Sequence, residues 1–391
     1  MQTKPSKTTT LLLTAGCFLA FFVFGFTDNL KGPTLPAMLA ELNFDYGMGG
    51  NIFFGEYFGF LIATLITGIL ADRFGLKSVI LLAGFFLGIG VSGYSAFSSA
   101  FLLSGSLFIV GMGLGALELG PNAIIVSLHH ERKGLYLNLM SVLHGLGSLI
   151  APLFAGWLLS LSISWRVIYR WDLALVALFV VIFLFLRFPK TEEKTQIDFR
   201  HIPHIAFKGD LPWFYVAICF YVAAEIGMGS WLVTFLQDVR NISVANSSQA
   251  LSLFFAMIMV GRFIGGFFVQ RIGYLRSILF VSIGGILCIV LGLLGPKETF
   301  FLLPFTGLFL SIIFPTITAA VSDVHAENGN TILGVLFTFA GLGGLIGPWL
   351  IGWGGDFFNL SIGFALNIVF MLILVISVVI LLKRSSYGQK T

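Results

Sequence analysis

The sequence predicts an all-α polytopic membrane protein, with twelve spanning helices in two six-helix bundles related by a pseudo-two-fold axis along the membrane normal. Composition, the distribution of apolar runs and an internal repeat support this prediction. Of the 391 residues, 57% are hydrophobic and only 10% are charged, whereas about 25% of the residues in a soluble domain are charged. Mean hydropathy is +0.98.

Charge and cysteine content exclude several other classes of protein. The 22 Lys and Arg exceed the 18 Asp and Glu by a net charge of only +4, which is too small and too dispersed for a nucleic-acid surface. Cys17, Cys219 and Cys288 each lie within an apolar run, which predicts small core residues and excludes a disulfide framework or a metal cage. We therefore expect no metal, no cofactor and no nucleic-acid partner.

Twelve apolar runs are long enough to cross a bilayer, which requires about 20 residues for about 30 Å of hydrocarbon. Lys4 and Lys7 precede the first run as in a signal peptide. That run, however, exceeds a signal-peptide core of about 7–15 residues, so we expect a helix of the mature protein. The predicted spans cover residues 11–38, 47–71, 77–96, 100–127, 134–160, 171–188, 211–238, 246–269, 276–295, 299–321, 329–353 and 360–382.

The longest polar stretch lies between the sixth and seventh runs. It contains His201 and His204, but without a nearby cysteine or further histidine a solvated linker is favoured over a metal site. The predicted organisation is an N-terminal six-helix bundle (1–188), a cytoplasmic linker (189–210) and a C-terminal six-helix bundle (211–391).

The distribution of basic residues predicts the orientation. With the N-terminus inside, sixteen Lys and Arg fall in inner segments, and four fall in outer ones: Arg166, Arg170, Arg240 and Lys297. Because basic loops stay on the cytoplasmic side, both termini are expected in the cytoplasm, with a bacterial inner membrane as the location.

Two motifs recur at nearly the same spacing. The segment GLGSLIAP at 145–152 returns as GLGGLIGP at 341–348, an offset of 196 residues. The pattern GxxxDRxG at 68–75 returns as GxxxQRxG at 266–273, an offset of 198 residues. Since six spans separate the copies, both halves have the same orientation, which indicates a parallel repeat.

Twelve spans, a parallel repeat, a basic central loop and the GxxxDRxG motif resemble the major facilitator superfamily. Within it, the chain is similar to the branch of fucose permeases and bacterial glucose/mannose permeases. The motifs that carry this resemblance are Asn29-Leu30 with Leu35-Pro36, Gly113–Glu118 with Asn122, Leu137–Leu139 running into Gly145–Gly147, Tyr221–Glu225 with Trp231, and Phe314–Ile317.

The resemblance implies a carbohydrate carrier driven by an ion gradient, usually of protons, in which two six-helix bundles rock about a central site. One position departs from the fucose permease pattern. Where that pattern has an acidic residue three positions after the Asn of the first helix, this chain has Gly32, and its acid, Asp28, precedes Asn29. The resemblance therefore assigns no proton role to Asp28.

Acids within the spans are functional candidates in their own right, because a carboxylate at the bilayer centre costs about 2.5–3.5 kcal/mol on insertion scales. Glu118 shares a helix face with Asn122 beside Pro121, and burial would favour its neutral form. We predict proton coupling at Glu118, Asp28 and Glu225, with buried structural acids as the alternative.

Other polar residues in the spans divide between solute binding and gating. Lys31 stands three residues after Asp28 and is expected to neutralise it, while Glu56 near an outer helix end is either a gate or solvated. The predicted gating residues are Asp72, Arg73, Arg262 and Glu56. The predicted solute ligands, chosen for hydroxyl hydrogen bonding or aromatic stacking, are Asn29, Glu118, Asn122, Asn138, His144, Glu225 and Trp231.

Three functions remain to be compared. The first is proton-coupled import of a monosaccharide-like solute by a monomer in the bilayer, and sodium is an open alternative as the coupling ion. The second is proton-antiport export of amphipathic compounds. The third, a membrane enzyme or sensor, lacks support because the sequence contains no HExxH, G-x-S-x-G or Walker motif. The amides near Glu118 favour a polar solute.

Overall fold

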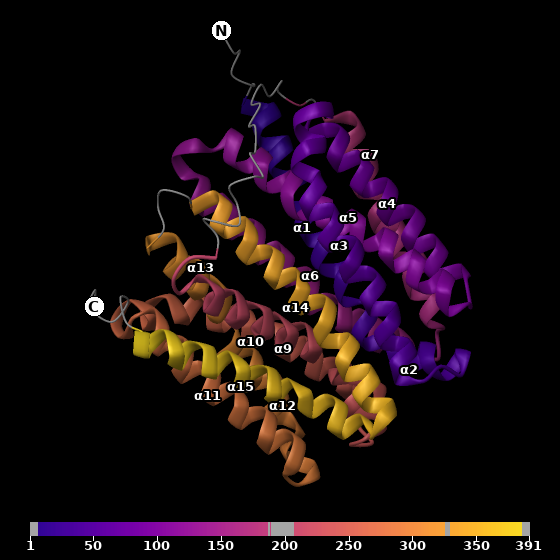
Figure 1. The fold of residues 1–391 in the computed structure, drawn as a ribbon. Helices are drawn as coiled ribbons and strands as arrows, with labels where there is room; N and C mark the ends of the chain where they lie inside the picture. The colour runs from indigo at the N-terminus through magenta and orange to yellow at the C-terminus, as the bar shows by residue number, and fades with distance from the viewer. Residues whose placement is uncertain (1–6, 187, 189–206, 325–328, 385–391) are drawn as a thin grey trace. The chain divides into compact units, whose positions relative to one another are not determined.

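The computed structural model describes residues 7–186, 188, 207–324 and 329–384, and within them the regular secondary structure is entirely helical (Figure 1). Twelve helical segments are long and apolar enough to cross a membrane, which confirms the predicted number of spans. Most of the predicted linker, including His201 and His204, lies outside the described residues.

The described part of the first half contains seven α-helices and one 3₁₀ turn. These are α1 (Lys7–Asn29), α2 (Lys31–Leu42), α3 (Tyr46–Phe74), α4 (Leu76–Ala96), α5 (Ala100–Leu128), η1 (His130–Arg132), α6 (Lys133–Ser160) and α7 (Trp165–Phe185). The described part of the second half contains α9 (Leu211–Asp238), α10 (Val244–Ile272), α11 (Tyr274–Leu294), η3 (Lys297–Phe301), α12 (Leu302–Leu310), α13 (Ile313–Val324), α14 (Gly329–Phe357) and α15 (Leu360–Arg384).

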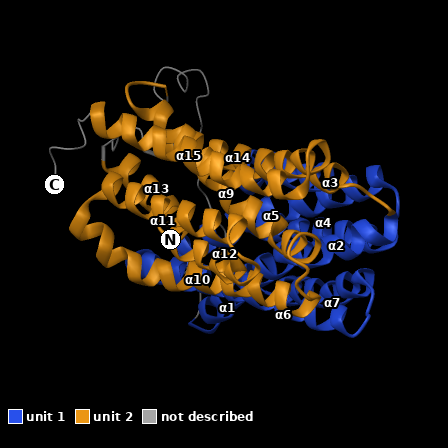
Figure 2. Cartoon of the chain, turned by 90° about the horizontal axis from the view of Figure 1, so that it is seen from below, with its two compact units in different colours: residues 1–42, 51–196 blue, residues 43–50, 197–391 orange. Residues whose placement is uncertain are grey.

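The described residues pack into two units, coloured separately in Figure 2. The first unit takes them from 1–42 and 51–196, and the second from 43–50 and 197–391. Residues 43–50, which the sequence places in the first half, thus pack with the second unit. There Asp356 accepts hydrogen bonds from the backbone N–H of Tyr46 at 2.9 Å and of Gly47 at 2.6 Å, which caps the start of α3.

The first predicted span is broken in two. The helix α1 ends at Asn29 and α2 begins at Lys31, where the sequence prediction had one helix over 11–38. Pro33 has no backbone N–H to donate to the carbonyl of Asn29, so the regular hydrogen-bond pattern is interrupted here. Helical bonding resumes with Thr34, whose N–H donates to the Leu30 carbonyl at 3.3 Å.

The sixth span begins six residues earlier than the predicted 171. Its N-cap is Ser164, whose hydroxyl oxygen accepts from the backbone N–H of Arg166 at 3.3 Å. Arg166 and Arg170, predicted to lie in an outer loop, therefore belong to the first turns of α7. These charged residues are tolerated at the helix end because neighbouring groups bind Arg166 and because Arg170 is exposed.

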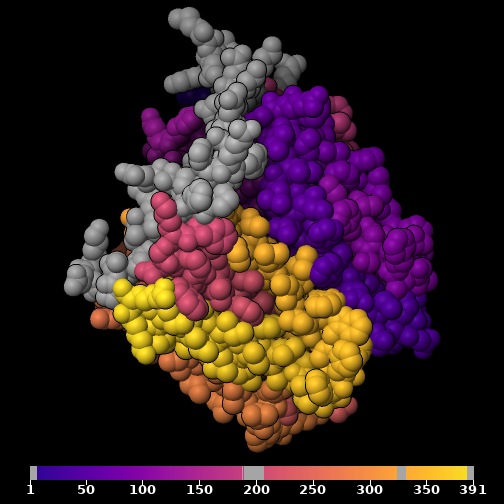
Figure 3. Space-filling view, in the orientation of Figure 1, coloured from indigo at the N-terminus to yellow at the C-terminus, as the bar shows by residue number. Residues whose placement is uncertain are grey.

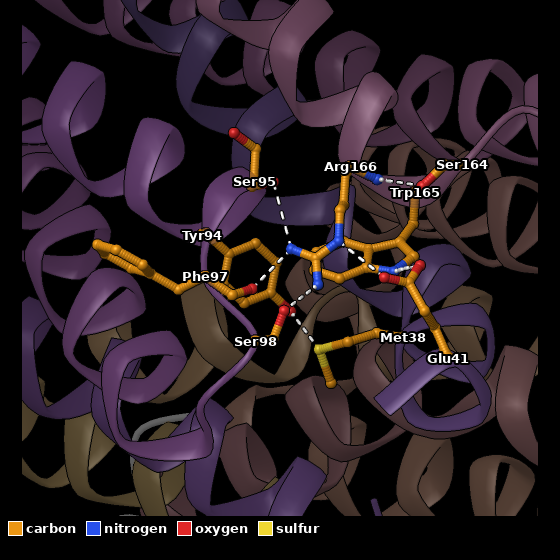
Figure 4. Close-up of polar contacts among 9 residues, drawn as sticks. All are labelled: Met38, Glu41, Tyr94, Ser95, Phe97, Ser98, Ser164, Trp165 and Arg166. Atoms are coloured by element: carbon orange, nitrogen blue, oxygen red, sulfur yellow. Dashed lines mark hydrogen bonds and ion pairs between the residues drawn. The ribbon is translucent and has the colours of Figure 1, made fainter. Parts of the chain in front are cut away.

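Arg166 joins three helix ends of the first unit (Figure 4). Its Nε donates to Glu41 Oε1 on α2 at 2.8 Å, and its Nη1 donates to the carbonyl of Phe97 after α4 at 2.6 Å. Trp165 donates its indole N–H to the other Glu41 oxygen, also at 2.8 Å. A cation at a helix C-terminus satisfies carbonyls that lack intrahelical partners, so this contact fixes the position of α7.

The tenth span is also interrupted, between α12 and α13. Pro315 lacks the N–H that would have bonded to the Ser311 carbonyl. Elsewhere in the second unit, Arg240 closes the end of α11 by donating to the carbonyls of Gly292 at 2.8 Å and Leu293 at 2.6 Å. The described part of each unit therefore contains an arginine bonded to the carbonyls that end a helix.

Backbone geometry confirms the internal repeat. Gly75 and Gly273, the last residues of the two GxxxDRxG-like motifs, both have positive φ, at 82° and 86°. The close packing of α1 on α6 recurs as that of α9 on α14. A side chain at Gly147 would collide with the Phe22 carbonyl, and one at Gly343 would collide with the Cys219 carbonyl. The repeat thus places glycine where two helices approach most closely.

The outer surface of the second unit suits contact with lipid. Figure 3 shows α15, in yellow, as a continuous strip of this surface. It exposes large apolar side chains along its length: Ile362, Val369, Leu372 and Ile376. A helix that is apolar on its exposed face as well as its packed face is typical of a membrane span.

Candidate functional site

A buried ionic cluster lies at the break between α1 and α2. Lys31 Nζ is 2.5 Å from Asp28 Oδ1 and 2.8 Å from Glu56 Oε2. The predicted pairing of Lys31 with Asp28 is confirmed. Glu56, on α3, is a second partner that spacing along one helix does not reveal.

Burial of this cluster is nearly complete. The exposed side-chain fractions are 6% for Lys31, 3% for Glu56 and 16% for Asp28. The ammonium group of Lys31 also lies 4.4 Å from the centre of the Tyr57 ring, a cation–π distance. Glu56 is therefore not solvated, and of the two predictions for this residue, a gate or a solvated acid, the second is wrong.

The ionised groups of this cluster do not cancel in charge. Two ionised carboxylates and one ammonium sum to −1, so one added proton makes the group neutral. Removing charge from water costs several kcal/mol per ion even after relaxation of the surroundings. One proton more or less therefore changes the net charge of this buried cluster between zero and −1.

A second buried acid, Asp172, lies on α7. Its Oδ1 accepts a hydrogen bond from the Thr27 hydroxyl at 3.0 Å, and Thr27 directly precedes Asp28 in the sequence. Asp172 was not among the predicted site residues because the predicted span began at residue 171, which placed this acid at a solvated helix end. The N-cap signal of Ser164 would have moved the boundary and placed Asp172 two turns inside the helix.

Glu118 and Asn122 lie on α5 as predicted, both half-buried. The Asn122 amide nitrogen donates to the backbone carbonyl of Glu118 at 2.6 Å. One amide hydrogen is thus used within the helix, next to Pro121, which lacks a backbone N–H. The structure places the carboxyl and the amide one turn apart, and their roles in coupling or solute binding stay predictions.

The remaining polar candidates of the first unit differ in environment. Asn29 donates its amide N–H groups to the Gly25 carbonyl at 2.8 Å and to Ser148 Oγ at 3.0 Å. His144, one turn before Ser148 on α6, has its ring centre 4.7 Å from that of Phe24. Asn138, also on α6, is exposed. The structure thus brings Asn29 together with the Ser148 turn of α6, whereas Asn138 lies near the N-terminal end of α6.

In the second unit, Glu225 on α9 is half-buried. Tyr221 lies one turn earlier on the same helix, and the charge of Arg262 on α10 acts on Glu225. Arg262 is itself exposed. The two residues are thus within electrostatic reach of one another. The coupling role of Glu225 and the gating role of Arg262 stay predictions.

Trp231 does not present its ring to a solute in this structure. It is 0% exposed, and its indole N–H donates to the Pro348 carbonyl at 2.9 Å. The ring packs where Gly352 allows close approach of α14. Because a buried ring cannot stack on a sugar, we leave Trp231 out of the proposed site.

Asp72 and Arg73, the acidic and basic residues of the GxxxDRxG motif, are exposed at the end of α3. The Arg73 guanidinium lies 5.3 Å from the centre of the neighbouring Phe74 ring. Nearby, Lys77 donates to the carbonyls of Leu184 and Leu186, each at 2.9 Å, and so satisfies the end of α7. The gating role of Asp72 and Arg73 stays a prediction.

Comparison with known proteins gives consistent results. A model of the Major Facilitator Superfamily matches residues 17–303. A glucose/galactose transporter of Brucella abortus is 27% identical, covering 90% of this chain and 89% of that protein. The L-fucose-proton symporter of Escherichia coli is 22% identical, covering 84% and 83% respectively.

The fold also matches a solved transporter. The crystal structure of the nucleoside transporter NupG carrying the D323A substitution superposes with a TM-score of 0.81 at 15% sequence identity. The match covers 96% of this chain and 99% of that one. At this level of identity the similarity establishes the fold.

Proposed function

Because the chain belongs to the Major Facilitator Superfamily, we propose that it is a secondary transporter that imports a monosaccharide-like solute together with protons. Its relatives include proteins named for glucose/galactose transport and for L-fucose-proton symport. Transport follows a rocker-switch cycle of alternating access, driven by the ion gradient without a cofactor.

The buried cluster of Asp28, Lys31 and Glu56 is the observation that carries the coupling proposal. With one proton it is neutral and compatible with a dry interior, and without that proton it bears a net negative charge. Since the cluster lies where α1 gives way to α2, a change in the bend of this broken helix changes its access to water. A proton bound on one side of the membrane is then released on the other.

We assign solute binding to polar side chains, most of which are half-buried on their helices. In the first unit these are Asn29, Glu118, Asn122 and His144, with Asn138 at the exposed end of α6, and in the second unit Glu225. Amide, imidazole and carboxylate groups can bond to sugar hydroxyls as donors or acceptors. Glu118 combines this role with proton coupling.

We further propose that the protein works as a monomer in a bacterial inner membrane, with both termini in the cytoplasm. The excess of basic residues in the predicted inner segments supports this orientation. Reporter fusions at each terminus that are active only in the cytoplasm test the orientation, and inactivity of both fusions would reverse it.

An uptake panel in proteoliposomes tests the function. The purified full-length protein is offered hexoses, deoxyhexoses, disaccharides, nucleosides and cationic dyes, with and without an inward proton gradient. We expect accumulation of a monosaccharide that requires the gradient. Uptake of dyes but of no sugar would favour the alternative of amphipathic export. Accumulation that depends on a sodium gradient and not on the proton gradient would show that sodium, not the proton, is the coupling ion.

Substitution of Glu118→Gln tests the coupling role assigned to Glu118. The amide keeps the size and much of the hydrogen bonding of the carboxyl but cannot release a proton. We expect loss of proton-driven accumulation, while counterflow exchange of the solute continues. The matched control is Glu131→Gln in η1, which makes the same change at an exposed acid outside the proposed site and is expected to accumulate solute. Unchanged accumulation by Glu118→Gln would remove Glu118 from the coupling mechanism.

A further inference from the structure

The carboxyl group of Asp172 is held by one oxygen only. Asp172 is 1% exposed, and its Oδ1 accepts from the Thr27 hydroxyl at 3.0 Å. Its Oδ2 is buried without a hydrogen-bond partner among the described residues. Buried polar groups are paired in about 90% or more of cases, so an unpaired carboxyl oxygen at this depth is unusual.

The charged and titratable groups around α7 are engaged elsewhere. The helices packed against it are α1, α2, α4 and α6. From α1 and α2, Asp28 and Lys31 pair with each other. From α4, the Tyr94 hydroxyl donates to a methionine sulfur at 3.0 Å, and from α6, His144 contacts a phenylalanine of α1. On α7 itself, the hydroxyl of Tyr169 lies 3.4 Å from a threonine hydroxyl.

These surroundings disfavour an ionised Asp172. A buried carboxylate without a paired cation costs several kcal/mol, and a single hydroxyl donor returns only part of that cost. Protonation at Oδ2 removes the buried charge, which is the larger of the two costs, although the new O–H group still has no acceptor among the described residues. The geometry seen here therefore favours the neutral form of Asp172.

We propose that Asp172 is a proton-binding residue of the transport cycle, distinct from the Asp28–Lys31–Glu56 cluster. The O–H bond forms at Oδ2 with a proton taken from water, and it breaks when a conformational change lets water reach the carboxyl again. The role in transport rests on the proposed function, whereas the protonation itself does not. Asp172 is then a third place in the first unit that holds a proton, beside the cluster and Glu118, so coupling is not limited to one proton per cycle.

Thr27 connects this site to the moving part of the helix. It lies on the last turn of α1, next to Asp28 and three residues before the break at Leu30. A hydroxyl donor stabilises a carboxylate more than a carboxylic acid. Thr27 therefore favours the charged form of Asp172, whereas burial favours the neutral form. A shift of this turn relative to α7 would weaken the hydrogen bond from Thr27 and, at the same time, change the exposure of the Asp172 carboxyl to water.

Infrared spectroscopy of the full-length protein in lipid tests the proposal without any solute. The carboxylic-acid C=O stretch is recorded during a pH titration for the wild type and for Asp172→Asn. We expect the difference between them to contain an acid band at neutral pH that disappears at alkaline pH. A carboxylate signal at neutral pH, or an acid band that persists to the alkaline limit, would each overturn the proposal.

Two further measurements test the link through Thr27 and the identity of the bound ion. Thr27→Val removes the donor that favours the charged form, so the midpoint of the Asp172 band should move to higher pH, and this variant serves if Asp172→Asn does not fold. An unmoved midpoint contradicts the link through Thr27. Loss of the acid band on adding sodium, at constant pH, would make Asp172 a cation ligand instead. Because no solute is needed, a negative uptake panel leaves these results interpretable.

Discussion

The chemistry of this protein depends on single charged side chains whose partners come from other helices. The Asp28–Lys31 pair is readable from sequence because residues three apart share a helix face. The third member, Glu56, lies on α3 and joins only through tertiary packing. Asp172 was missed for a similar reason: a polar residue at the predicted edge of a span is indistinguishable from a solvated one until the helix start is known.

Replacing Lys31 isolates the contribution of the ammonium group. In Lys31→Met, the carboxylates of Asp28 and Glu56 lose their cation, and breaking a buried pair in this way costs about 3–5 kcal/mol. Protonation relieves the repulsion and the burial of charge, so the variant should be most stable in acidic buffer and lose stability as pH rises. Thermal unfolding in detergent across a pH series measures the effect.

The matched control is the double variant Lys31→Met with Glu56→Gln, which removes one carboxylate as well. Its stability should depend less on pH than that of the single variant, because fewer buried acids lack a cation. If Lys31→Met unfolds with the same pH dependence as the wild type, the cluster does not hold its charge in the way described.

At the scale of helices, hydropathy identified each span but not the interruptions within them. Pro33 and Pro315 are visible in the sequence, yet proline inside a membrane span often only kinks the helix. Whether a break occurs depends on what satisfies the freed carbonyls nearby. The start of α7 shows the converse case, in which a cap and the Arg166 contacts extend a helix beyond its apolar run.

Close packing of α1 on α6 depends on Gly147, since even a methyl group there meets the backbone of α1. We expect Gly147→Ala to lower stability by about 1–3 kcal/mol, the usual cost of overpacking. Gly134→Ala on the same helix meets nothing within 4 Å, and its stability should be unchanged or slightly raised. The apparent melting temperatures in detergent compare the two.

The repeat gives this prediction a second, independent trial. Gly343→Ala should reproduce the loss in the second unit, because Gly343 packs against the Cys219 carbonyl. Gly266→Ala, which also meets nothing within 4 Å, is its control. Equal melting temperatures for Gly147→Ala and Gly134→Ala would show that α1 and α6 separate easily at this point.

At the scale of the whole molecule, the sequence predicted the membrane class, the twelve spans and the repeat, because all three depend on composition and period rather than on detailed contacts. The assignment of residues 43–50 to the second unit was not predictable. It follows from hydrogen bonds of Tyr46 and Gly47 to Asp356, more than 300 residues away along the chain. Chain order alone cannot indicate such a contact.

The two arginines that close helix ends bear on the internal repeat of the molecule. At the 198-residue offset of the repeat, Arg166 corresponds to Phe364, and Arg240 corresponds to Leu42. Neither arginine occupies the counterpart of the other, although each serves a comparable purpose in its own half. The two contacts are therefore not copies of one another within the repeat, and each half closes a helix end with an arginine of its own.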